Sequence, residues 1–191
     1  MRRAGFVALL AALVLLAPAT QALAHGGNPN YRSVIEEVTP HVPGVEFQVL
    51  DYDSYMQLVD RGGHPVTIYG YEGEPYARIL HDGTVQVNRR SPATYLNADR
   101  YSSTPVPAGV DPAAAPQWRP VSTRPALAWH DHRVHWMLPT LPPAVAADPG
   151  SPHRISSWTV VLTYAAGTGD QRLVATGTLD CTATNLYCTT P

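Results

Sequence analysis

The 191-residue chain has only two cysteines, little charge and no excess of positive residues. Its formal net charge is −2 and 15% of its residues are charged, so neither a nucleic-acid groove nor a polybasic membrane patch is indicated. The sequence contains no G-x-S-x-G motif, and we expect no free cysteine that could act as a nucleophile, which argues against a hydrolase. These absences favour a binding protein over an enzyme.

Long apolar sequence is confined to the first 24 residues. Met1–Arg3 is a short basic start, residues 4–19 are almost wholly apolar, and Gln21–Ala24 offers small residues for cleavage. This is the pattern of a secretory signal peptide, which is too short and wrongly flanked to be a membrane span of the mature protein. We therefore expect cleavage after Ala24, a secreted or cell-envelope location, and no transmembrane segment in the mature chain.

The two cysteines, Cys181 and Cys188, lie close together near the C-terminus. Export would place them in an oxidising compartment, and their C-x6-C spacing is typical of neither redox nor zinc sites. We predict a Cys181–Cys188 disulfide in a tail of residues 181–191. So short a loop would add about 2–3 kcal/mol of stability. Residues 25–180 then suit one domain.

From Val38 onward the sequence predicts an all-β fold. Val45, Phe47 and Val49 alternate with polar neighbours, and residues 158–164 and 172–179 alternate in the same way. Turn signals rich in glycine and aspartate separate these runs at the spacing expected of a sandwich. We predict a single immunoglobulin-like β-sandwich of about seven or eight short strands, interrupted by two long proline-rich loops at residues 102–125 and 138–152.

The densest group of reactive side chains is residues 129–137, with the sequence WHDHRVHWM. Proline bounds this segment on both sides, at Pro125 and Pro139, and its period-two pattern favours a strand over a helix. We predict a central strand with Trp136 in the core. Asp131 and Arg133 would form a structural ion pair on the opposite face.

Four blocks of the sequence carry a resemblance. They are HGGNPNYRS at 25–33, GYEGEPY at 70–76, SPATYLN at 91–97 and the WHDHRVHWM segment. Together they resemble a group of exported actinobacterial proteins, and the similarity runs over nearly the whole mature chain. The resemblance implies export and a shared fold, but it brings no activity with it. Members of that group often continue into a C-terminal membrane anchor, where this chain has its cysteine tail.

The sharpest functional hypothesis is an extracytoplasmic copper site built on the mature N-terminus. Cleavage after Ala24 makes His25 the first residue, whose α-amine and imidazole could bind one metal ion together. His130 and His132 lie at a spacing compatible with joint ligation, and imidazole is a good ligand for copper. Auxiliary candidates are His135, Met137, Met56 and Asp131. The alternative is that His130 and His132 are core residues bonded to backbone carbonyls.

Two other functions stay open at this point. A non-catalytic cell-envelope module could bind glycan or protein through an aromatic face made by Tyr69, Tyr71, Tyr76, Tyr95 and Tyr101. A copper-dependent polysaccharide monooxygenase is a more remote alternative, because only the His-Gly start, the size and the sandwich are similar. Convergence of His25, His130 and His132 would favour the metal hypothesis over the envelope module.

Overall fold

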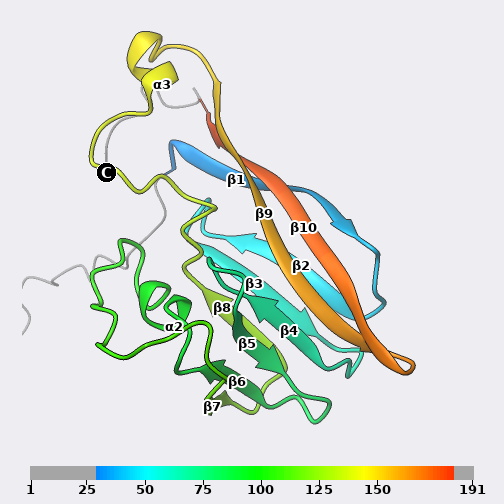
Figure 1. Cartoon of the computed structure of the whole chain (residues 1–191). Helices are drawn as coiled ribbons and strands as arrows, with labels where there is room; N and C mark the ends of the chain where they lie inside the picture. The colour runs from blue at the N-terminus through cyan, green and yellow to red at the C-terminus, as the bar shows by residue number, and fades with distance from the viewer. Residues whose placement is uncertain (1–28, 183–191) are drawn as a thin grey trace, which may run out of the picture.

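A computed structural model describes residues 29–182 as ten strands in two antiparallel sheets, which confirms the all-β sandwich (Figure 1). The larger sheet has the order β1-β10-β9-β4-β5-β6-β7 and the smaller β2-β3-β8. The strands are β1 (Tyr31–Thr39), β2 (Val45–Leu50), β3 (Tyr55–Asp60), β4 (Val66–Tyr69), β5 (Pro75–Ile79), β6 (Val85–Asn88), β7 (Trp118–Ser122), β8 (Ala126–Trp129), β9 (His153–Ala166) and β10 (Gly169–Cys181). The short helices α2 (Ala93–Leu96) and α3 (Pro143–Ala147) lie in connections. The immunoglobulin-like topology stays a prediction.

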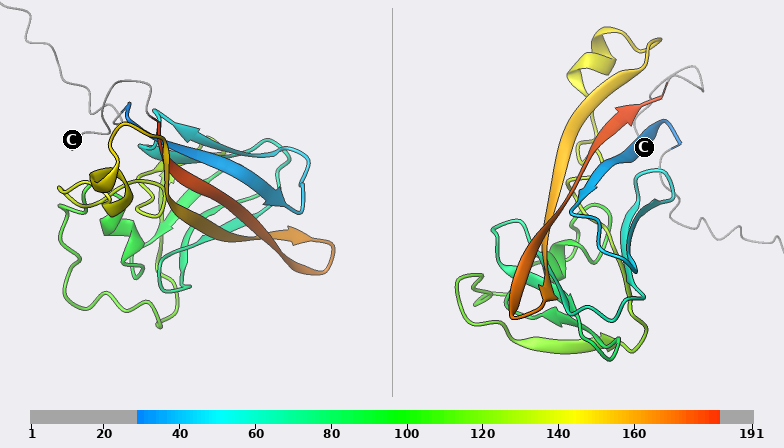
Figure 2. Two further views of the ribbon diagram at one scale, coloured as in Figure 1. Left: turned by 90° about the horizontal axis from the view of Figure 1, so that it is seen from above. Right: turned by 90° about the vertical axis from the view of Figure 1, so that its right-hand side faces the viewer.

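Alternating burial explains why these segments form strands. In β3, Met56 and Leu58 are fully buried while their neighbours are half-exposed, and in β9 Val160 and Leu162 are buried in the same way. These side chains meet those of the facing sheet in one apolar core. Figure 2 shows β9 and β10 as a long twisted hairpin that runs along the body of the protein.

The strand count exceeds the expected seven or eight because β1 and β7 give weak sequence signals. β1 mixes two glutamates into its run, and β7 contains Pro120. Proline is tolerated in β7 because β7 is an edge strand of the larger sheet. The two proline-rich loops contain more regular structure than predicted, because β7 occupies the end of the first and α3 lies within the second. No helix among residues 29–182 is both long and apolar enough to cross a membrane.

The prediction of a central strand through residues 129–137 is wrong. β8 ends at Trp129 and pairs only with β3, and residues 130–138 form a compact turn and loop. Trp129 is the core residue, at 2% exposure. Trp136 is half-buried against a separate small cluster, where its Nε1–H donates to the Thr140 carbonyl at 2.6 Å.

The side chain of Asp131 explains why the strand stops. Its carboxylate accepts hydrogen bonds from the Trp129 indole Nε1–H (2.8 Å) and from the backbone N–H of Arg133 (3.1 Å). The Val134 N–H closes a turn onto the Asp131 carbonyl at 3.0 Å. Such local side-chain bonds compete with a β-ladder and reverse the chain.

Candidate functional site

The turn at Asp131 brings three histidines together at the end of β8. The ring centroids of His132 and His135 are 5.3 Å apart, and those of His130 and His135 are 6.5 Å apart. A strand would have placed His135 on the face opposite the other two. The reversal of the chain instead makes His135 the middle member of a cluster that we call the histidine cluster: His130, His132 and His135.

Two members of the cluster are each fixed by one backbone carbonyl. His130 donates its Nδ1–H to the Ser54 carbonyl at 2.8 Å, and His135 donates its Nε2–H to the Arg100 carbonyl at 2.8 Å. A carbonyl oxygen only accepts, so these bonds place the lone pairs on Nε2 of His130 and Nδ1 of His135. Neither of these two nitrogens has a hydrogen-bond partner among residues 29–182, and Nδ1 of His135 is fully buried.

His132 differs because both of its ring nitrogens are engaged. Its Nε2 lies 3.2 Å from the Asp99 carbonyl, and its Nδ1 lies 2.7 Å from the Ser102 hydroxyl, which can donate to it. Tyr71 stacks on the ring at 5.9 Å and accepts a hydrogen bond from the His132 backbone N–H at 2.9 Å. Ser102 adopts a positive φ of 55°, uncommon for a non-glycine residue and often found where the surroundings hold a site in place.

A buried ion pair between Arg100 and Asp53 joins the two chain segments that position the histidine cluster. Arg100 Nη2 lies 2.7 Å from Asp53 Oδ2, and Arg100 Nη1 donates to the Ser54 hydroxyl at 3.0 Å. The same two segments supply the carbonyls that hold His130 and His135.

Burial, followed by the nearby Arg100 charge, lowers the pKa of His135 to about 4, and burial also lowers the pKa of His130. Both imidazoles are therefore neutral at pH 7, the form that binds metal ions.

Acid should destabilise the protein through His135. The pKa of this group falls from its ordinary 6.5 to about 4 on folding, so between these values the unfolded chain binds a proton that the folded chain does not. Stability is then lost as pH falls through this window, by about 2 kcal/mol between pH 7 and pH 5. Urea unfolding at both pH values would measure it, with His135→Gln as the comparison. An equal loss in the variant would contradict the role of His135.

The expected ion pair between Asp131 and Arg133 is present, and its carboxylate is fully buried. The side chain of Asp131 is 0% exposed and that of Arg133 is 24% exposed. Two parallel contacts join them, from Nε to Oδ1 at 2.7 Å and from Nη2 to Oδ2 at 2.6 Å. The Arg133 guanidinium also lies over the Tyr71 ring, 5.1 Å from its centroid. With both oxygens used in this way, Asp131 is a structural residue of the loop.

The other candidate residues lie apart from the cluster or outside the described residues. Met56 is fully buried in the core, and Met137 lines a different hollow beside Leu138. Cys181 is buried at the end of β10. His25 and Cys188 lie outside the described residues, so the N-terminal site and the disulfide stay predictions.

The five tyrosines do not form the single exposed face proposed for an envelope module. Tyr76 is buried in the core, and Tyr95 is half-buried with its hydroxyl donating to the Arg89 carbonyl at 3.1 Å. Tyr71 is half-buried and donates to the Asn97 side chain. Tyr101 alone of the five is largely exposed, at 49%.

A cavity of about 450 Å³ opens beside His130, and little in the sequence predicts it. It is lined by Tyr55, Ala98, Asp99, Arg100, Tyr101, Ser103 and His130. The Tyr55 ring packs on the His130 ring at 4.1 Å. The available signal was Asp99 followed by Ser103 and Thr104, because aspartate ahead of hydroxyl residues is typical of a side-chain-stabilised loop. We call this cavity the aromatic pocket.

The histidine cluster is by itself an incomplete metal site. Among residues 29–182, no group of three or more His, Cys, Asp or Glu side chains is arranged to hold a metal ion. The two nitrogens with lone pairs would need further ligands from elsewhere. Comparison of the chain with protein-family models, curated proteins and solved structures found no match.

Proposed function

We propose that the protein is an exported copper-binding protein whose site joins the histidine cluster to the mature N-terminus. The supporting observation is that Nε2 of His130 and Nδ1 of His135 keep lone pairs without partners, while the other nitrogen of each ring is held by a carbonyl. Histidines that bind metal ions almost always donate their second N–H to such an acceptor, which fixes the ring. Neutral imidazole suits copper well.

The remaining ligands would come from His25. An N-terminal histidine offers two nitrogens, its α-amine and its imidazole, which would complete a four-nitrogen site with His130 and His135. Tyr31 lies near Asp53, and burial followed by the Asp53 charge raises the pKa of the Tyr31 hydroxyl. Asp53 in turn pairs with Arg100, whose backbone carbonyl holds His135. The segment from His25 to Tyr31 can span at most about 20 Å. The proposal requires this segment to bring His25 from the start of β1 to the cluster.

This assignment prefers His135 to His132 as the second ligand of the loop. Both ring nitrogens of His132 are engaged by Ser102 and Asp99, so its lone pair is already used. We assign His132 to positioning, because it ties the cluster to the segment that carries Arg100. The buried cation of Arg100 would oppose a metal ion at His135, as it opposes a proton there, and its pairing with Asp53 offsets part of that charge. The described residues give no specific support for monooxygenase chemistry, so the proposal stops at binding.

Calorimetric titration with Cu(II) tests the roles of the two loop histidines. His130→Ala and His135→Ala should each weaken binding by about tenfold or more, and their effects should not add, because both nitrogens would bind one ion. His135→Gln gives a second variant in case the smaller side chain disturbs the fold. His81→Ala serves as the control, because His81 lies in the β5–β6 turn and bonds to the Gly63 carbonyl. Equal Cu(II) binding by the parent protein and all four variants would contradict the assignment.

A further inference from the structure

The aromatic pocket has the size and shape of a small-molecule site. Its volume of about 450 Å³ falls in the range of ligand pockets, about 300–1,000 Å³. Its walls are formed by Tyr55, His130 and residues of the 98–103 loop, including Tyr101. The copper proposal uses only Nε2 of His130 among the groups that line this pocket, so the occupant of the rest of the volume is a separate question.

The charged groups that line the pocket are already compensated. Asp99 accepts hydrogen bonds from the backbone N–H groups of Tyr101, Ser103 and Thr104, at 2.9–3.0 Å. The hydroxyls of Ser103 and Thr104 also donate to this carboxylate. Arg100 is 9% exposed and pairs with Asp53. A charged ligand would find no uncompensated partner here and would lose its hydration, which is costly.

The groups that remain available are aromatic faces and neutral polar atoms. Tyr101 is 49% exposed, with the Arg100 guanidinium 5.7 Å from its ring centroid, and Tyr55 packs its ring on that of His130 at 4.1 Å. Nε2 of His130 can accept a hydrogen bond, and the Ser103 hydroxyl keeps an acceptor lone pair after donating to Asp99. A ligand that matches these walls has an apolar face for tyrosine and hydroxyl groups for the acceptors.

We infer that the aromatic pocket binds an uncharged saccharide ring. A pyranose combines a face of C–H groups with a rim of hydroxyls, and so meets both requirements without carrying charge. A purely apolar ligand would leave the His130 and Ser103 acceptors buried without partners, and an acidic sugar would bring an uncompensated carboxylate. The inference does not depend on copper, because in the metal-free protein the His130 ring serves only as a hydrogen-bond acceptor.

The test is a titration of metal-free protein with matched sugars. Cellobiose, maltose and N,N′-diacetylchitobiose are the uncharged probes, and digalacturonic acid is the charged probe of similar size. We expect at least one uncharged disaccharide to bind with a Kd of about 1 mM or tighter, and digalacturonic acid to bind more weakly than that disaccharide. Chelator in the buffer keeps the result separate from the copper proposal.

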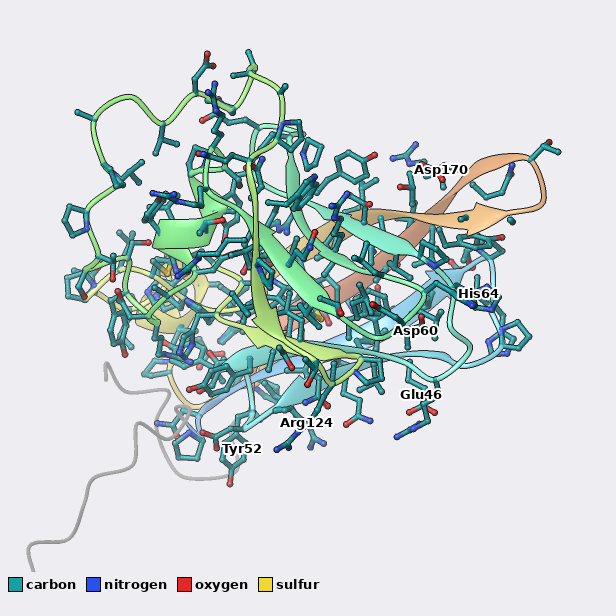
Figure 3. The ribbon with its side chains drawn as sticks, turned by 90° about the horizontal axis from the view of Figure 1, so that it is seen from below. Glu46, Tyr52, Asp60, His64, Arg124 and Asp170 are labelled. Carbon is teal, nitrogen blue, oxygen red and sulfur yellow. The ribbon has the colours of Figure 1, made fainter. Side chains whose placement is uncertain are left out.

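Tyr101→Ala should weaken the binding by about tenfold, because it removes the exposed aromatic wall. Because Tyr101 is largely exposed, its truncation should leave the fold intact, and near-ultraviolet circular dichroism checks this. Tyr52→Ala is the matched control: Tyr52 is 51% exposed, does not line the pocket, and points outward from the body of the protein (Figure 3). No binding of any uncharged probe, tighter binding of digalacturonic acid, or unchanged binding by Tyr101→Ala would each overturn the inference.

Discussion

Replacing Asp131 with alanine is expected to cost about 3–5 kcal/mol of folding free energy, because it leaves a largely buried guanidinium without its partner. The carboxylate is 0% exposed and accepts hydrogen bonds from the Trp129 indole and from three N–H groups of Arg133. Burial by itself raises the pKa of Asp131, but the hydrogen bonds and charge of Arg133, with the Trp129 hydrogen bond, outweigh it and hold that pKa below its usual range. The loss therefore includes the pair, the indole bond and the turn.

Urea unfolding of the variant and the parent protein would measure this cost. Glu46→Ala is the control, because the Glu46–Arg61 pair is exposed on both sides and should contribute about 0–1 kcal/mol. Removing both Asp131 and Arg133 should cost less than the sum of the two single changes, since no unpaired charge then remains. A loss from Asp131→Ala as small as that from Glu46→Ala would mean that the 130–138 loop does not depend on this carboxylate.

The architecture of this protein was largely predictable because it follows from local periodicity. Alternation in β3, β9 and β10 reports burial directly, so a two-sheet β protein could be expected from the sequence. The same rule failed in the WHDHRVHWM segment. Its alternation is compatible with a strand, but the Asp131 side chain captures the neighbouring N–H groups and turns the chain. Periodicity carries no information about that competition.

The arrangement of the histidines could not be predicted for a different reason. The carbonyls that fix His130 and His135 belong to Ser54 and Arg100, which are 76 and 35 positions away in the sequence. A backbone carbonyl is present at every residue, so no sequence pattern marks the two that matter. The motif showed that imidazoles gather in this segment, but only tertiary structure distinguishes the lone pairs of His130 and His135 from the engaged nitrogens of His132.

The N-terminus should have the largest effect on copper binding. Adding one residue ahead of His25 moves the α-amine away from the imidazole and removes one of the two ligands that this residue would supply. We expect the tight site to be lost, with affinity falling by about a hundredfold or more, while the fold of residues 29–182 is unchanged. In the unmodified protein, affinity should also fall as pH drops through the histidine range near 6.5, because protons compete for the α-amine and imidazole of His25, whereas the lowered pKa of His135, about 4, keeps that ring neutral.

The most direct test of the account is therefore a Cu(II) titration of three proteins: the mature chain beginning at His25, the chain with one added residue, and that chain after an aminopeptidase has removed the addition. We expect tight one-to-one binding in the first, its loss in the second and its return in the third. Equal affinity in all three would show that the N-terminal amine is no ligand, and would contradict the copper site proposed at His130 and His135.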